Sequence, residues 1–163
     1  MAESAKAVII MGSKADIKWC EKIADGLSGF GIEAVLRVAS AHKAPLKCLD
    51  IIREYEDSAG IFITVAGRSN ALSGFSDAQT SLPVIACPPY GEKYGGADVF
   101  STINMPSGVA PMLVADAGNA ALAAAKVLAL KDGSVLAKVK AYQAKLKETI
   151  ERDDEEVNQL PDN

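Results

Sequence analysis

Short apolar runs alternate with segments of helical periodicity along this chain, and that alternation constrains its fold more than any other feature. The apolar runs cover residues 7–11, 34–38, 61–66, 83–87 and 112–115. Each run has the length of a strand, whereas the segments between them repeat apolar residues every three or four positions, as helices do. Strands that are apolar almost throughout are typical of a parallel sheet covered by helices on both faces. We therefore predict a three-layer α/β/α sandwich.

Several residues suit the starts of the predicted helices. Asp16 can cap a helix over residues 16–30, and Asn119 can cap the last helix of the sandwich. Pro45 suits the first position of a helix that continues to Tyr55. These starts place one helix after each of the first two strands and another after the fifth.

The chain length and the order of elements predict one domain with an extension. A chain of 163 residues suits a single core. The simplest connection of alternating strands and helices is the flavodoxin-like order of a doubly wound parallel sheet. We assign residues 1–133 to one α/β domain. Residues 134–163 are predicted to form a C-terminal helix and acidic tail, which are not a separate domain.

The last helix of the sandwich, over residues 119–130, is apolar almost all round, and only Lys126 interrupts it. A helix without a polar face is usually covered on every side. A domain of this size has little with which to cover it. We therefore expect other subunits to cover this helix and predict a homo-oligomer.

The C-terminal helix carries an apolar stripe made up of Val135, Val139, Tyr142, Leu146 and Ile150. Such a stripe fits a helix that packs on its own domain. It also fits an arm that reaches across a neighbouring subunit, which is the interpretation that we favour.

The distribution of charge argues against binding to nucleic acid or membranes. Residues 151–163 contain six acidic residues and one arginine, so this tail accounts for the formal net charge of −4. The body is nearly neutral and offers no basic stripe to follow a phosphate backbone. No apolar run is long enough to cross a bilayer or to serve as a secretory signal.

The cysteines and the single histidine argue against disulfides and metal centres. Cys20, Cys48 and Cys87 are odd in number and contain no CxxC pair. This spacing disfavours a disulfide framework or a zinc site and favours a reducing cytoplasm. With only one histidine, His42, a protein-held transition metal is improbable. We predict no metal and no cofactor.

The unusual loops of the chain all follow predicted strands. In open α/β sheets, ligands bind beyond the carboxyl ends of the strands. The loops over residues 12–16, 40–43 and 66–74 are therefore expected to share a ligand site. Gly12 and Ser13 offer backbone N–H groups and a hydroxyl at a helix start, which suits a phosphate. Small residues are also common at such turns for steric reasons alone.

Four charged or titratable residues in these loops are candidates for function. Asp16 could accept hydrogen bonds from ribose hydroxyls, although its pattern alone favours a helix cap. Lys43 and Arg68 could hold an anionic small molecule or could be ordinary solvated charges. A lone histidine is more often structural, but the position of His42 in a ligand loop favours proton transfer. Cys87 lacks a second histidine to activate it and reads as a core residue.

The motifs GSKAD, SAHK, AGRSNALSG, ACPP and NMPSG, in this order and spacing, resemble the PurE family of purine biosynthesis. The match runs from about residue 8 to residue 130. The likeness is greatest to class II, whose members carboxylate aminoimidazole ribonucleotide (AIR) directly with carbon dioxide to give the 4-carboxy nucleotide (CAIR). Class I members are mutases of the N5-carboxylated nucleotide and typically have an arginine at Lys43 and a second histidine at Ala71.

The resemblance implies a role for each candidate residue. His42 would carry the proton, and Ser13, the turn amides beginning at Gly12 and Lys43 would bind the phosphate. Asp16 would bind the ribose. The ring and carboxylate would be surrounded by Ser40, Ala41, Gly67, Arg68, Ser69 and Asn70. Ala15 stands where the family commonly has a second serine, which weakens the phosphate assignment slightly.

The resemblance also implies a homo-octamer, with a tetramer as the alternative, and a reaction without metal, biotin or ATP. Two other functions stay open from the residues alone: the class I mutase, and a flavodoxin-like nucleotide-binding or signalling domain. A receiver domain would need acidic residues after the first strand, where this chain has Gly12 and Ser13.

Overall fold

The structure, a computed structural model, describes residues 5–89 and 91–159 and contains one five-stranded parallel sheet. The strand order is β2-β1-β3-β4-β5, which confirms the predicted flavodoxin-like arrangement. The strands are β1 (Lys6–Met11), β2 (Glu33–Val38), β3 (Ile61–Val65), β4 (Val84–Ala86) and β5 (Met112–Leu113).

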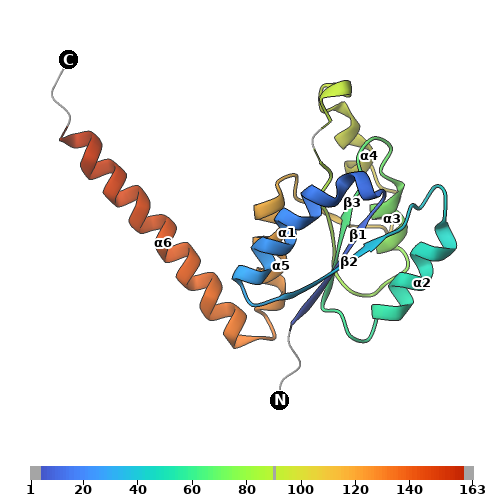
Figure 1. Cartoon of the computed structure of the whole chain (residues 1–163), viewed down its shortest axis with the longest axis horizontal. Coiled ribbons are helices and arrows are strands. Elements are labelled where there is room, and N and C mark those ends of the chain that lie inside the picture. Colours follow the sequence, from blue (N-terminus) through green and yellow to red (C-terminus); the bar gives the residue numbers. More distant parts are fainter. Residues whose placement is uncertain (1–4, 90, 160–163) are drawn as a thin grey trace.

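Helices cover both faces of the sheet, as predicted (Figure 1). α1 and α5 lie on one face, and α2 and α3 lie on the other. The α-helices are α1 (Ile17–Gly29), α2 (Pro45–Tyr55), α3 (Ala71–Asp77), α4 (Phe100–Ile103), α5 (Ala117–Leu128) and α6 (Gly133–Asn158). Three short 3-10 turns are η1 (Lys14–Asp16), η2 (Glu92–Tyr94) and η3 (Ala97–Val99).

The interior strand β1 divides its side chains between two cores. Ile9 and Met11 face the core with α1 and α5, whereas Val8 and Ile10 face the core with α2. This alternation follows from the two-residue period of a strand. Because β1 is paired on both edges, by β2 and β3, its carboxyl end lies between the carboxyl ends of these two strands.

Two of the predicted helix caps are wrong in detail. Asp16 occupies the position before α1, but its side chain makes no capping hydrogen bond, because η1 precedes the helix and is capped by Ser13. Asn119 lies inside α5, and the cap is Asp116, whose carboxylate accepts from the Asn119 backbone N–H at 2.8 Å. The first of these corrections leaves the Asp16 carboxylate free for another use.

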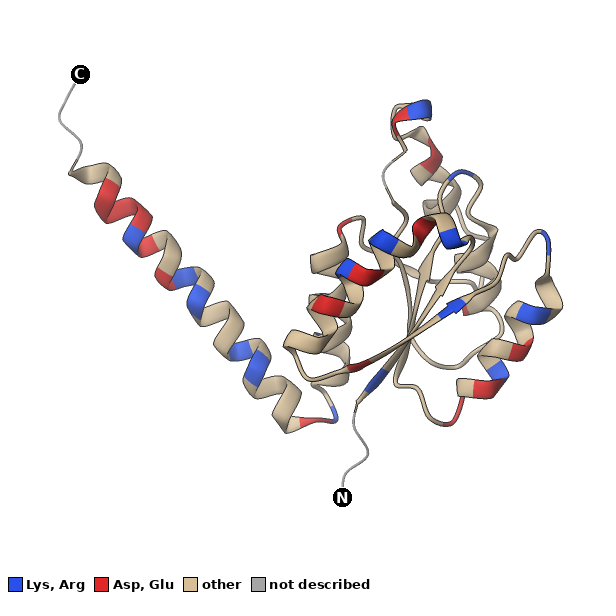
Figure 2. Cartoon of the chain, in the orientation of Figure 1, with Lys and Arg blue, Asp and Glu red and all other residues tan. Residues whose placement is uncertain are grey.

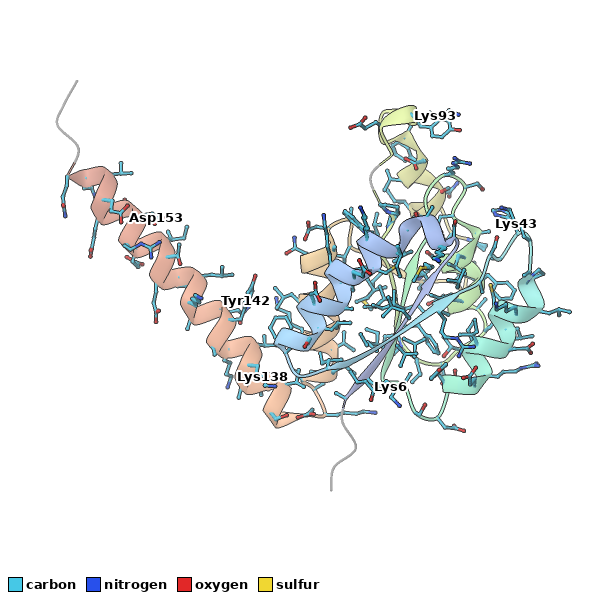
Figure 3. The ribbon with its side chains drawn as sticks, in the orientation of Figure 1. Lys6, Lys43, Lys93, Lys138, Tyr142 and Asp153 are labelled. Atoms are coloured by element: carbon cyan, nitrogen blue, oxygen red, sulfur yellow. The ribbon has the colours of Figure 1, made fainter. Side chains whose placement is uncertain are left out.

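α6 leaves the α/β body as a long projecting helix (Figure 1). Its first turns are anchored by buried Val135 and Val139, and the ring of Tyr142 packs edge-on against Phe30 with centroids 5.5 Å apart. Beyond Tyr142, which Figure 3 labels part-way along the helix, the side chains of Leu146 and Ile150 are exposed. Lysines dominate its first half and acidic residues its second (Figure 2).

α5 is covered more completely by its own chain than its composition suggests. It packs against α1 and the start of α6, and its buried residues are all alanines (Ala117, Ala120, Ala121, Ala124 and Ala125). Gly26 of α1 sits so close that a Cβ there would lie 2.7 Å from the Ala121 Cβ. Small residues therefore allow two helices to approach closely. None of the helices in the described part of the chain is long and apolar enough to cross a membrane.

Candidate active site

A cavity of about 450 Å³ opens at the carboxyl ends of β1, β2 and β3. This is the point where the strand order reverses, since β1 connects to β2 on one side and has β3 on the other. The structure therefore brings together three loops that lie far apart in the sequence. They contribute Gly12, Ser13, Ala15, Asp16, Ser40, Ala41, His42, Lys43, Ala66, Gly67, Arg68, Ser69, Ala71 and Leu72 to the lining.

The first loop offers fewer free amides than its sequence suggests. The Gly12 N–H donates to the Val65 carbonyl at 2.9 Å, and the Ala15 N–H donates to Ser13 Oγ at 3.2 Å. The Ser13 N–H has no acceptor among the residues that the structure describes. An anion in this turn would therefore meet the Ser13 amide and hydroxyl first, while the Ala15 amide is already engaged.

Asp16 lies half-buried in the wall of this cavity. Burial raises the pKa of its carboxyl group above the ordinary value, and the positive charge of Arg68 offsets part of this rise. A carboxylate that is partly shielded from water and makes no helix-capping bond is suited to accept hydrogen bonds from ligand hydroxyls.

The second loop is a closed turn with His42 at its tip. The Ala44 N–H donates to the Ser40 carbonyl at 2.8 Å, and the Lys43 N–H donates to Ser40 Oγ at 3.3 Å. α2 begins immediately afterwards at Pro45. The side chains of His42 and Lys43 are exposed at the cavity rim, and Figure 3 labels Lys43 on this turn between β2 and α2. The turn fixes the backbone and leaves the imidazole free to meet a ligand.

The third loop contains Arg68 in a left-handed conformation, with φ of 59°. Two residues about thirty positions further along the chain hold it there. The Arg68 N–H donates to Asp98 Oδ2 at 3.0 Å. The Ser101 hydroxyl shares its one hydrogen between two carbonyl oxygens, that of Arg68 at 2.9 Å and that of Asp98 at 2.7 Å. Neither contact was predictable from the sequence, because Asp98 in η3 and Ser101 in α4 belong to helical turns too short to show a periodic pattern.

Asn70, which is predicted to lie beside the substrate, is not among the residues that line the cavity. Its side chain is only 3% exposed and caps α3, accepting from the Ser73 N–H at 3.2 Å. Its amide donates to Ser73 Oγ and to Thr102 Oγ1, at 2.7 and 2.9 Å. Asn70 therefore ties the third loop to α3 and α4 from inside the protein.

Cys87 and the acidic residues provide no alternative centre for chemistry. Burial raises the pKa of the Cys87 thiol to about 11, so the nucleophilic thiolate is scarce at neutral pH. Within residues 5–89 and 91–159, no group of three or more His, Cys, Asp and Glu side chains could hold a metal ion.

A smaller cavity of about 60 Å³ adjoins the first at Gly67 and Arg68 and extends towards Pro88 and Asp98.

Three comparisons relate the chain to known proteins. A family model described as AIR carboxylase matches residues 6–149. The phosphoribosylaminoimidazole carboxylase of Archaeoglobus fulgidus is 62% identical over 155 residues, which cover 95% of this chain and 86% of that protein. The protein of the same name from Treponema denticola is 44% identical over 149 residues, covering 90% of this chain and 94% of that one.

A solved structure agrees with this relationship. The crystal structure of Treponema denticola PurE superimposes with a TM-score of 0.92 at 42% sequence identity. The superposition covers 95% of this chain and 99% of that chain. The likeness therefore includes the whole α/β body and extends into the C-terminal helix.

Proposed function

The chain belongs to the AIR carboxylase family and carboxylates aminoimidazole ribonucleotide in purine biosynthesis, and from this premise we propose how its residues divide the reaction. One observation carries the proposal: His42, the only histidine, lies on the rim of the same cavity as Asp16 and Arg68. The cavity, at about 450 Å³, falls within the range of roughly 300–1,000 Å³ that suits small-molecule sites.

His42 is the proposed proton carrier. The aminoimidazole ring is an electron-rich enamine whose carbon 4 can attack carbon dioxide without assistance from a metal or ATP. The new carbon–carbon bond leaves carbon 4 tetrahedral, with its hydrogen still attached. The imidazole of His42 takes that proton, and the electron pair of the broken C–H bond returns to the ring and restores its aromaticity. In the reverse reaction the imidazolium protonates carbon 4 before carbon dioxide leaves.

The other residues of the cavity hold the nucleotide in the proposed arrangement. The Ser13 amide and hydroxyl, together with the Lys43 ammonium, bind the phosphate. The Asp16 carboxylate accepts hydrogen bonds from the ribose hydroxyls. Ser40, Ala41, Gly67, Arg68 and Ser69 surround the ring and the carboxylate. Arg68 stabilises the new carboxylate, because its guanidinium can donate two parallel hydrogen bonds to the two carboxylate oxygens.

Direct carboxylation by carbon dioxide is favoured over rearrangement of an N5-carboxylated nucleotide. Ala71 presents only a methyl group to the cavity, so His42 is the one imidazole available in it. Lys43 is a compact and mobile point charge, which holds anions differently from the planar fork of an arginine. Both features suit a site that admits carbon dioxide to bound AIR.

The projecting α6 supports the proposal of a homo-oligomer, with an octamer expected and a tetramer as the alternative. Leu146 and Ile150 continue the apolar stripe of α6 beyond Tyr142 and are exposed on this chain, so a partner subunit would cover them. We further place the enzyme in the cytoplasm, where a reducing environment suits three free and buried cysteines.

Labelled carbon dioxide tests the direct reaction. The protein is incubated with AIR and labelled bicarbonate at equilibrium with dissolved carbon dioxide, without ATP. We expect label in the carbon-4 carboxylate at a rate set by dissolved carbon dioxide. Conversion of the N5-carboxylated nucleotide much faster than its spontaneous breakdown, without incorporation of label from solution, would identify a mutase instead.

A further inference from the structure

Arg68 has an unusual backbone for a residue of its type. In the part of the chain that the structure describes, it is the one non-glycine residue with a positive φ. The left-handed conformation is unfavourable for side chains with a Cβ, because the Cβ crowds the following carbonyl oxygen. Such a conformation persists only where the surroundings impose it, and it is often found at functional sites.

The surroundings that impose it belong to a single segment, η3 and the start of α4. The Asp98 carboxylate accepts from the Arg68 N–H at 3.0 Å. Ser101 Oγ lies 2.9 Å from the Arg68 carbonyl oxygen and 2.7 Å from that of Asp98, and it accepts from the Asn70 N–H at 3.0 Å. Both polar groups of the Arg68 backbone are therefore held by residues thirty or more positions away.

The segment that carries Asp98 is built closely around this carboxylate. Gly96 has φ of 80° and turns the chain into η3. A Cβ at Gly91 would lie 3.1 Å from Asp98 Oδ2, so a larger residue there would press on the acceptor of the Arg68 hydrogen bond. Glycine at position 91 thus leaves room for the carboxylate beside the Arg68 amide.

The side chain of Arg68 is directed by this backbone. Arg68 lines the main cavity, and its positive charge acts on the Asp16 carboxylate across that cavity. A return of φ from 59° to the ordinary negative region would rotate the Cα–Cβ bond about the chain and carry the guanidinium elsewhere. The place of the cation therefore depends on the hydrogen bonds to its backbone.

We propose that Asp98, supported by Ser101, is a positioning residue that holds Arg68 in the left-handed conformation required to present its guanidinium to the substrate. Neither residue needs to touch the substrate. This inference rests on the proposed role of Arg68 in binding the nucleotide and its carboxylate, so its test includes Arg68 itself.

The test measures the affinity for AIR by calorimetric titration, together with KM and kcat, in a set of variants. Asp98→Ala removes the acceptor, and we expect it to weaken AIR binding by about tenfold or more, as for a lost charge-assisted hydrogen bond. Asp98→Asn keeps an acceptor oxygen and should retain most of the affinity. Asp77→Ala is the matched control, because Asp77 also accepts a backbone N–H, from Ala110 at 2.7 Å, but does not line the cavity.

Arg68→Gly separates positioning from general damage. Glycine adopts the left-handed conformation without strain and carries no guanidinium, so Asp98 has nothing left to position. We expect Arg68→Gly to weaken binding on its own, and Asp98→Ala to cause little further loss in that background. Should Asp98→Ala fail to fold, Ser101→Ala takes its place in the same cycle, since it removes the hydrogen bond to the Arg68 carbonyl.

The outcomes distinguish the two ideas. Unchanged binding in Arg68→Gly would refute the binding role of Arg68 and the positioning role of Asp98 together. A loss in Arg68→Gly, with unchanged binding in Asp98→Ala or in folded Ser101→Ala, would overturn the positioning role alone. Equal losses for Asp98→Ala in the two backgrounds, or an Asp98→Asn variant as weak as Asp98→Ala, would also overturn it.

Discussion

The backbone N–H of Lys43 donates to the hydroxyl oxygen of Ser40 at 3.3 Å, and this bond helps to close the turn that carries His42. Ser40 therefore acts on the proton carrier through the backbone, in addition to lining the cavity. A loosened turn would spread the imidazole over several positions, and small misplacements of a reacting group are costly in rate.

Replacement of Ser40 by alanine tests this relationship. We expect Ser40→Ala to lower kcat by roughly 2- to 10-fold, the equivalent of one neutral hydrogen bond of about 0.5–1.5 kcal/mol. Thr80→Ala is the matched control. Thr80 Oγ1 also accepts a backbone N–H in a turn, from Leu82 at 3.0 Å. It precedes β4 and so lies at the amino end of that strand, whereas the cavity lies at the carboxyl ends of the strands. Equal kcat values for wild type and Ser40→Ala would show that this hydrogen bond does not position His42 for the reaction.

Asp16→Asn is expected to stabilise the free protein while weakening substrate binding. Burial raises the pKa of Asp16, so the folded protein holds this proton more tightly than the unfolded chain. The charged carboxylate therefore destabilises the fold at pH values above its folded pKa. This cost disappears as the pH falls below the unfolded value of about 3.9.

Thermal unfolding and calorimetric titration measure the two effects of Asp16→Asn. At pH 7 the Tm of the variant should exceed that of wild type, and the difference should vanish well below about pH 3.9, where the wild-type group is protonated in both states. The affinity for AIR should fall, because a charged acceptor of ribose hydroxyls is lost. Asp25→Asn, at an exposed position on α1, the helix that follows Asp16, should change neither quantity. A lower Tm for Asp16→Asn at pH 7 would contradict the interpretation.

Asn70 and Ser69 are neighbours with different roles. Asn70→Ala would leave the Thr102 hydroxyl without a partner in the interior and would leave the Ser73 hydroxyl with Thr64 alone, and we expect the free energy of unfolding to fall by about 2–4 kcal/mol. Ser69→Ala removes an exposed hydroxyl from the cavity lining and should leave the Tm unchanged. Denaturant unfolding of the two variants would contradict this if their midpoints were equal.

How much of this architecture the sequence predicts depends on the kind of interaction. The five apolar runs predicted the strands of a parallel sheet, because burial on both faces leaves a continuous apolar pattern. The strand order was predicted as the simplest way to connect alternating strands and helices. The cap of α5 was harder. Asp116 and Asn119 both have side chains that can cap a helix, and the sequence does not decide which of them precedes the first turn. In the structure Asp116 is the cap, and its carboxylate accepts the hydrogen bond from the Asn119 N–H.

The candidate site was predicted to a similar extent. The loops after β1, β2 and β3 had to meet, because the carboxyl ends of parallel strands share one edge of the sheet. The orientation of residues inside a loop is another matter. Between Ser69 and Asn70 the chain turns inwards to begin α3, so one side chain lines the cavity and the next is buried. Asp98 was missed, since its contact with Arg68 depends on the path of the segment that joins β4 to β5.

The exposed stripe of α6 predicts a specific effect on assembly. Leu146→Glu introduces a charge where we expect an apolar contact with a partner, and it should shift the protein to smaller species in light scattering. Ala144→Glu adds the same charge at an exposed position on the other side of the helix and should not. Truncation after Arg152 should also preserve assembly, because the stripe stays intact. A wild-type mass of 17.0 kDa, that of one chain, at micromolar concentration would contradict the proposed oligomer.

Turnover by His42→Asn at saturating AIR and carbon dioxide tests most directly the central claim that one imidazole carries the proton. Asparagine keeps the polarity and approximate size of histidine but cannot shuttle a proton. We expect turnover to fall by about 100- to 10,000-fold, while calorimetric titration shows AIR binding within a few-fold of wild type. Turnover near the wild-type rate in a variant that folds and binds AIR would contradict the account, because the proton of carbon 4 would then leave by a route that does not involve His42.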